Sequence, residues 1–218
     1  GDKANGRVDK IFRDRISEHH SATHILHSSL REILGTHIRQ AGSLVKSDRL
    51  RFDFSHFSNI DNDTLKEIEN LSNERIRMNN EIVIQENVEY KKAIKNGATA
   101  FFEDKYGDFV RVVRIGDFSM ELCGGTHINS SGQIGSLYIS SESSISSGIR
   151  RIEAHVGESG FKYISNIKDF LTTSSSLLNS SIEKVPNSIE RIQKENDALR
   201  LKVSSFEKKA TKSLADQV

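Results

Sequence analysis

The sequence predicts an α+β fold, in which helices pack on one antiparallel sheet and a purely helical, coiled-coil-like tail follows. Two observations support this prediction. Before Pro186 and the serine-rich stretch 172–181, segments with helical spacing of apolar residues are mixed with segments of period two. After that break, apolar residues recur only at helical spacing. We therefore expect an α+β domain at residues 9–160 and a helical hairpin or coiled-coil region at 161–218.

The first helix is expected from about residue 8 to 34, where apolar residues recur with spacings of three and four, and it should end at Gly35. Between residues 48 and 54, apolar and charged residues alternate, which is typical of a half-buried strand. The same reasoning adds a strand before it at 36–46, a helix at 61–78, a strand at 81–89 and a short helix at 90–96.

The remaining strands follow in the second half of this domain. The ranges 109–115 and 118–122 flank Gly116 and Asp117, a pair typical of a tight turn, and so predict a β-hairpin. Two further strands are expected at 135–142 and 148–155. Together these segments predict an antiparallel arrangement.

Composition limits the possible functions. Lys and Arg total 31 and Asp and Glu total 30 in 218 residues, so the formal net charge is only +1. Any contact with nucleic acid must then come from a local patch of charge. No apolar run reaches the ~18–20 residues of a membrane span. The single cysteine excludes an internal disulfide and suits a reducing compartment, so we expect a cytoplasmic location.

Two short motifs together suggest a metal site. His20 and His24 stand four residues apart on the first predicted helix, so both imidazoles leave the same face. Cys123 and His127 flank a glycine-rich turn and offer a thiolate and a third imidazole. Three nitrogens and one sulfur are a typical tetrahedral zinc set. The alternative is ordinary surface histidines and a buried cysteine, but the coincidence of both motifs with the only cysteine favours the metal.

Neighbouring histidines fit the metal site less well. His19 points away from the shared face, and His27 is expected in a supporting or core position. The helix lacks the glutamate of H-E-x-x-H, which excludes a metalloprotease of that type. Neither a Ser-His-Asp order nor a phosphate-binding glycine loop occurs.

Longer segments around these motifs resemble the editing domain of alanyl-tRNA synthetase. They are His20–Gly35, Gln40–Val45, Arg49–Phe54, Glu121–His127 and Ile145–Glu153. The resemblance covers about residues 1–160 and continues into the helical region. Threonyl-tRNA synthetase shares the histidine and cysteine layout, but the Gln40 segment and Cys-Gly-Gly-Thr-His resemble the alanyl version.

The resemblance implies a zinc-dependent deacylase that hydrolyses seryl- and glycyl-tRNA(Ala), with one Zn²⁺ per chain. It implies the zinc ligands His20, His24, Cys123 and His127, a catalytic role for Gln40 and Cys123, and substrate binding by Thr23, Gly124, Gly125 and Thr126. Residues 1–8 resemble the end of a preceding β-barrel subdomain. The adenylation domain of the family, which would bind ATP and Mg²⁺, is not represented, so we expect a fragment that does not charge tRNA.

Two other functions stay open. The chain could be a non-catalytic, zinc-stabilised RNA-binding or assembly module, or a free-standing trans-editing alanyl-tRNA deacylase. Arg150 and Arg151 are candidates for contact with the acceptor end of tRNA(Ala), although an ion-pair bridge to a neighbouring strand would use the same residues. Arg111 and Arg114 could also line a tRNA track.

The tail carries an apolar seam with alternating spacings of three and four. Its members are Ile189, Ile192, Asn196, Leu199, Val203, Phe206 and Ala210. Such a seam is typical of a two-stranded coiled coil, in which Asn196 would take an a position and the chain would self-associate. Three heptads make a short coiled coil, so for this fragment we favour the alternative, a helical hairpin in which the seam packs on residues 161–178.

Overall fold

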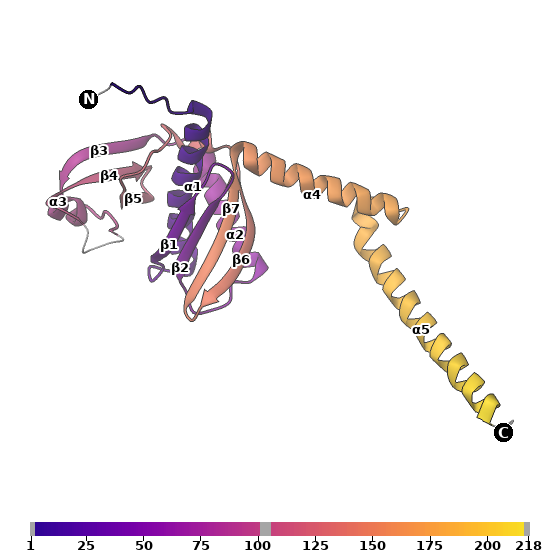
Figure 1. Cartoon of the computed structure of the whole chain (residues 1–218). Helices are drawn as coiled ribbons and strands as arrows, with labels where there is room; N and C mark the ends of the chain where they lie inside the picture. Colours follow the sequence, from indigo (N-terminus) through magenta and orange to yellow (C-terminus); the bar gives the residue numbers. More distant parts are fainter. Residues whose placement is uncertain (1–2, 101–105, 216–218) are drawn as a thin grey trace. The chain divides into compact units, whose positions relative to one another are not determined.

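The computed structural model describes residues 3–100 and 106–215, with side chains described to residue 209. Contacts divide the chain into two compact units, Gly1–Tyr163 and Ile164–Val218, which we describe separately. The first unit contains helices and antiparallel strands, as the sequence predicts (Figure 1). Residues 3–9 have no regular secondary structure, and residues 1 and 2 of the segment 1–8 lie outside the described part.

Helix α1 spans Lys10–Leu34 and carries half of the candidate metal ligands. The Asp9 carboxylate caps it by accepting the Phe12 N–H at 3.0 Å, which satisfies one of the free amides of the first turn. At the other end, Gly35 has a φ of 114° and donates its N–H to Arg31, which confirms the predicted stop. Between these ends the residues from His19 to Leu30 are mostly buried, because α1 is covered on several sides.

The larger sheet has four antiparallel strands in the order β1-β2-β7-β6. Their bounds are Gln40–Val45, Leu50–Ser55, Ile149–Val156 and Leu137–Ser146 respectively. Phe52 and Phe54 are fully buried, as the period-two pattern predicts. Asp53, between them, is also buried, because it pairs with Arg151 directly opposite on β7.

Helix α2 spans Asn62–Arg77 and packs beside α1. Its cap is Asp61, whose carboxylate accepts the Thr64 N–H at 2.7 Å. Apolar residues of both helices, among them Leu26, Leu30, Ile68 and Ile76, join Phe52 and Phe54 in one buried core. The core therefore fixes α1, and the ligands on it, against the larger sheet.

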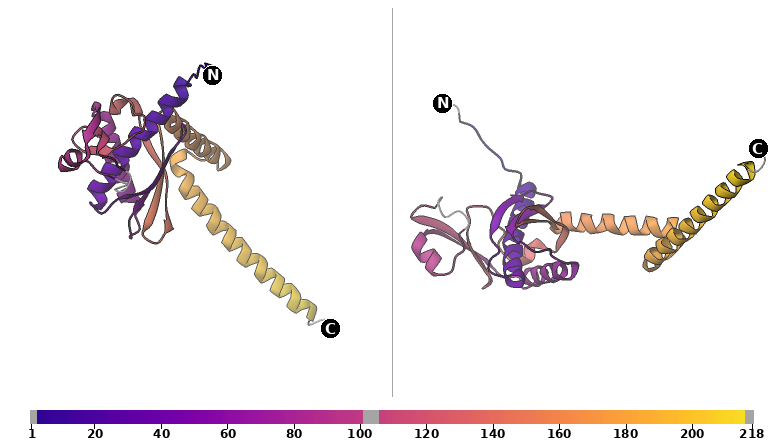
Figure 2. Two further views of the ribbon diagram at one scale, coloured as in Figure 1. Left: turned by 60° about the vertical axis from the view of Figure 1, so that its left-hand side comes forward. Right: turned by 90° about the horizontal axis from the view of Figure 1, so that it is seen from below.

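A smaller sheet has the order β3-β4-β5, with bounds Ile82–Glu89, Phe109–Ile115 and Ser119–Leu122, and a short helix α3 at Tyr90–Lys95. The expectation of one sheet is thus corrected to two. The period of two identifies strands but does not tell which strands pair. Helix α1 contacts β1, β2 and β7 of the larger sheet and β5 of the smaller one, and it lies between the two sheets (Figures 1 and 2).

The second unit is helical. It contains most of α4 (Gly157–Leu177), the short 3₁₀ helix η3 (Ile182–Lys184) and α5 (Val185–Ala215), with Pro186 in the first turn of α5. The seam residues Ile189, Leu199, Val203 and Phe206 are all exposed, so the described part of α5 does not bury its seam in a hairpin. The side chain of Ala210 lies outside the described residues. No helix in the described part of the chain is long and apolar enough to cross a membrane.

Candidate metal centre

Four predicted ligands from two distant segments meet beside α1. His20 and His24 lie one turn apart on α1, whereas Cys123 and His127 lie on the loop that follows β5. Their donor atoms are all within 4.8 Å of one another. Cys123 Sγ is 3.4 Å from Nε2 of His20 and 3.4 Å from Nε2 of His127. The group could hold a metal ion, because three imidazoles and a thiolate converge on one point.

The second nitrogen of each imidazole is occupied by the protein. Nδ1 of His20 lies 3.2 Å from the Thr126 carbonyl oxygen, and Nδ1 of His127 lies 3.1 Å from the Ser21 hydroxyl. Nδ1 of His24 lies 2.5 Å from a carboxylate oxygen of Glu121, which is an ion-pair contact without the geometry of a regular hydrogen bond. Such contacts set which ring nitrogen carries the proton and leave Nε2 for a ligand. The residues therefore fit a bound metal ion in their surroundings as well as in their donor atoms.

The charges of the cluster also suit a cation. Burial raises the pKa of the Cys123 thiol, but hydrogen bonds from His127, His20 and His24 outweigh it and lower the value to about 3. Burial lowers the pKa of His127 to about 4, against the opposing effect of Cys123, so this imidazole is neutral. The sulfur is thus a thiolate at neutral pH, the form that binds metals.

Glu121 is a buried carboxylate that contacts the candidate ligand His24 and its neighbour His27. Burial raises the pKa of its carboxyl group, but His24 and His27 outweigh this effect and lower it to about 2. Burial likewise lowers the pKa of His24, yet Glu121 and Cys123 raise it to about 10. Without metal, His24 is therefore an imidazolium with a proton on both ring nitrogens. Metal binding at one nitrogen would release one of these protons.

The turn between Cys123 and His127 needs its second glycine. A Cβ atom on Gly125 would overlap the His20 imidazole, whereas one on Gly124 would meet no atom within 4 Å. The Gly125 N–H points to Cys123 Sγ at 3.5 Å. Gly125 therefore lets the loop approach α1, and its amide contributes to the stabilisation of the thiolate.

A cavity of about 280 Å³ adjoins the cluster. Its lining includes His20, His24 and Cys123 together with Gln40, Thr23 and Gly124, so most of the predicted site residues share one cavity. Gln40 reaches it from the start of β1. The Thr23 hydroxyl donates to the His19 carbonyl oxygen at 2.8 Å, a bond within the helix.

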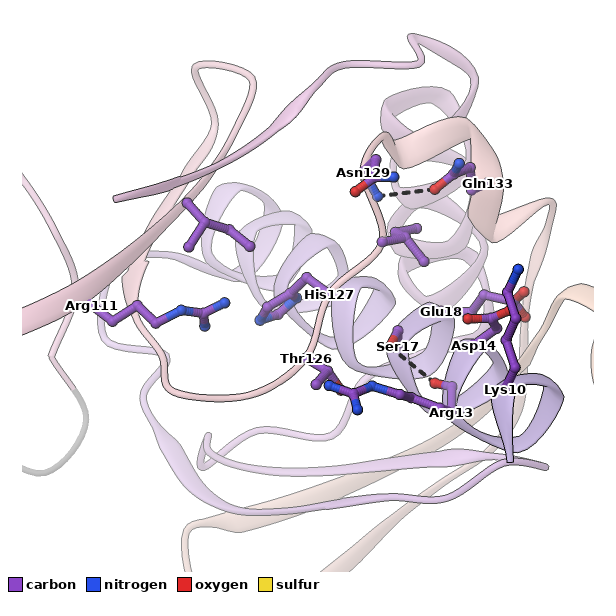
Figure 3. Close-up of a pocket in the computed structure, with 12 residues that line it drawn as sticks. Lys10, Arg13, Asp14, Ser17, Glu18, Arg111, Thr126, His127, Asn129 and Gln133 are labelled. Carbon is purple, nitrogen blue, oxygen red and sulfur yellow. Dashed lines mark hydrogen bonds between the residues drawn. The ribbon is translucent and has the colours of Figure 1, made fainter. Parts of the chain in front are cut away.

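A second, polar cavity of about 690 Å³ is lined by His127, which does not line the smaller cavity (Figure 3). Thr126 lines this cavity and not the smaller one described above. Its other walls carry both signs of charge, from Lys10, Arg13, Arg111, Asp14 and Glu18. The structure therefore separates Thr126 from Thr23 and Gly124, and Gly125 is not among the lining residues of either cavity.

Arg150 and Arg151 lie on β7 and are engaged inside the protein. Arg150 bonds both oxygens of Glu142 and donates to Asn59 at 3.1 Å. Arg151 binds both oxygens of Asp53, at 2.7 and 2.8 Å. These contacts favour the ion-pair alternative over a contact with tRNA.

No motif in the sequence assigned a role to Glu121, and none indicated the contacts that Arg111 makes here. Glu121 contacts His24 and also His27, whose Nδ1 is 2.7 Å away. Arg111 binds the carbonyl oxygens of Cys123 and Gly125. A signal for Glu121 was its position two residues before the candidate ligand Cys123, at the end of a predicted strand, because strand alternation continued to Cys123 would place both side chains on one face.

Comparison with known proteins agrees with this arrangement. Residues 110–153, from β4 to β7, match the family described as the threonyl and alanyl tRNA synthetase second additional domain. Over these residues the chain is therefore similar to a domain that occurs in both synthetases.

Individual relatives narrow the class of protein to one of the two synthetases. An alanine--tRNA ligase of Thermoanaerobacter sp. (strain X514) is 44% identical over 212 residues, which are 94% of this chain and 24% of the relative. That of Saccharophagus degradans is 44% identical over 100% of this chain and 25% of its own length. That of Nitrosomonas europaea is 52% identical over 163 residues, 75% of this chain and 19% of the relative. The chain is a homologue of alanine--tRNA ligase along nearly its whole length, and it spans about a quarter of these relatives.

Proposed function

We propose that residues 9–160 form an editing domain that hydrolyses seryl- and glycyl-tRNA(Ala), and that 161–218 begin the helical region that follows it. The observation that carries this proposal is the 280 Å³ cavity, which joins Gln40 and Gly124 to the ligand cluster. The cavity is small and lined by both polar groups and the Phe52 ring. Such a cavity suits a small polar amino acid ester rather than a large side chain.

We propose that the metal is Zn²⁺, one per chain, held by His20, His24, Cys123 and His127. This choice is supported by the mixed nitrogen and sulfur donor set. It is also supported by the buried Glu121, whose carboxylate contacts the candidate ligand His24. A bound zinc ion would supply a fixed positive charge that orients polar groups in the cavity. Four protein donors form a closed set, which is the pattern of structural zinc. We therefore assign the zinc an orienting role.

The chain's own residues then bind and orient the ester. The Gln40 side-chain amide lies in the cavity wall, where it can donate to the substrate carbonyl and accept from the ammonium group. Cys123 acts as a ligand that shapes the site, and Gly124 lets the substrate approach the loop backbone. A serine hydroxyl would satisfy a buried polar partner that the methyl group of alanine leaves unpaired, and such a mismatch discriminates strongly.

The partner in this proposal is the acceptor end of tRNA(Ala), and the compartment is the cytoplasm, where a reduced thiol persists. Attachment of alanine with ATP and Mg²⁺ would belong to the full-length enzyme. The non-catalytic RNA-binding or assembly module is the second candidate, supported by the closed ligand set. A free-standing trans-editing deacylase is less consistent with the match into α5.

A deacylation assay separates these candidates. Seryl-tRNA(Ala) is incubated with the protein as purified, with the protein after chelation, and with Cys123→Ala. We expect hydrolysis and stoichiometric zinc only in the first sample, while alanyl-tRNA(Ala) stays largely intact. Lys162→Ala, an exposed change on α4, serves as the matched control. Full deacylation by a verified metal-free protein would contradict the proposal, and bound zinc without hydrolysis would favour the non-catalytic module.

A further inference from the structure

We propose that Arg111 is the positioning residue of the metal centre: it clamps the Cys123–His127 loop so that the thiolate and the Gly125 amide keep their orientation. This inference rests on the metal site of the proposed function, but it concerns a residue outside the ligand set. Arg111 lies on β4, next to the strand from which the loop emerges. Figure 3 shows its side chain extended from the strand towards His127.

Arg111 binds the backbone on both sides of Cys123. Its main-chain carbonyl oxygen accepts the Cys123 N–H at 3.1 Å. Its guanidinium Nη1 donates to the Cys123 carbonyl oxygen at 2.8 Å. The backbone groups on either side of the Cys123 Cα atom are therefore bonded to one residue. This fixes the direction in which the Cys123 side chain leaves the loop.

Arg111 also binds the glycine turn. The same Nη1 donates to the Gly125 carbonyl oxygen at 2.8 Å. The peptide unit between the two bonded carbonyls is the one whose N–H points to Cys123 Sγ at 3.5 Å. Glycines have the widest backbone freedom, so a Gly-Gly turn needs an external constraint to hold one conformation. Arg111 supplies that constraint on both flanks of the amide that faces the thiolate.

Arg111 is itself held in place. Its Nε donates to a Glu86 carboxylate oxygen on β3 at 2.7 Å, and its side chain is only 21% exposed. Three directed bonds from one planar guanidinium need an arginine, because a lysine ammonium is a point donor on a flexible stem. Arg114 on the same strand is exposed, so it offers a matched control for charge and position.

The test measures metal binding, not hydrolysis. The full chain, Arg111→Met, Arg111→Lys and Arg114→Met are each loaded with Zn²⁺ in competition with a chromophoric chelator. Each is also loaded with Co²⁺, whose thiolate charge-transfer and d–d bands report the environment of Cys123. Thermal unfolding of each metal-free protein separates loss of fold from loss of positioning.

We expect Arg111→Met to raise the dissociation constant for zinc by about 10–100-fold, the usual effect of removing a residue that orients a ligand. We expect its cobalt bands to be shifted, Arg111→Lys to recover only part of the loss, and Arg114→Met to match the unsubstituted protein. Equal affinity and equal cobalt spectra for Arg111→Met and the unsubstituted protein would overturn the role of Arg111. A lowered unfolding temperature with an unchanged cobalt spectrum would also overturn it, because it would show a purely structural role. An unsubstituted protein that binds no metal would overturn the metal site itself, and with it the proposed function.

Discussion

Gly125 and His20 lie so close that a single added carbon atom would make the imidazole and the loop overlap. The two residues are far apart in the chain, and the contact joins the loop after β5 to the middle of α1. His20 in turn presents Nδ1 to the Thr126 carbonyl oxygen, one residue beyond Gly125. The candidate metal centre is therefore assembled by close approach of a loop backbone to a histidine ring, and this approach depends on a residue without a side chain.

This contact predicts different results for the two neighbouring glycines. Gly125→Ala should displace His20 and lower zinc affinity at least tenfold, because the methyl group would occupy the ring position. Gly124→Ala should keep zinc affinity within about twofold, because its methyl group meets no atom within 4 Å. Chelator competition measures both values. Equal losses in the two variants would show that the close approach to His20 does not matter.

Glu121→Gln tests whether the Glu121 carboxylate orients the candidate ligand His24. We expect zinc affinity to fall by about 10–100-fold, because a neutral amide orients His24 and His27 less strongly than a carboxylate does. The measurement is a zinc titration at pH 7. Glu67→Gln, an exposed change on α2, controls for the lost charge. An unaltered affinity in Glu121→Gln would remove this residue from the metal centre.

Gln40→His tests the cavity wall. We expect kcat/KM for seryl-tRNA(Ala) to fall more than tenfold while the melting temperature changes by less than about 2 °C, because the Gln40 side chain is only half-buried at the start of β1. Within the described part of the chain, the Gln40 side-chain amide donates one hydrogen bond, to the Ser43 hydroxyl at 3.3 Å. Ser43→Ala is the control for the loss of that bond. Unchanged turnover in Gln40→His would place Gln40 outside the site.

The exposed seam of α5 predicts self-association. In a parallel pair, Glu195 would face Arg200 of the second copy and Lys202 would face Glu207, so the flanking charges are complementary. We expect a dimer by sedimentation, and a tighter assembly with larger species for Asn196→Ile, because a buried asparagine restricts the number of strands at a cost in stability. Lys194→Ile, outside the seam, is the control. Monomers in all three samples would contradict the coiled coil.

Local patterns in the sequence were sufficient to predict most helices and strands and to propose the candidate metal ligands. Helical spacing and Gly35 predicted α1 and its end, and alternation predicted the buried Phe52 and Phe54. The spacing of four in His20 and His24 already placed two donors on one helix face. These features depend on neighbours within one turn or one strand, so the sequence by itself contains their physical cause.

Tertiary structure decided the contacts between segments that are distant in the chain. Glu121 and His27 are separated by 94 residues, and no pattern in either segment tells that they meet. The division into two sheets, the pairing of Arg151 with Asp53 and the clamp by Arg111 depend likewise on which strands lie side by side. A period of two fixes which face a side chain takes but not its partner, because strand pairing is made by backbone bonds that every sequence can form.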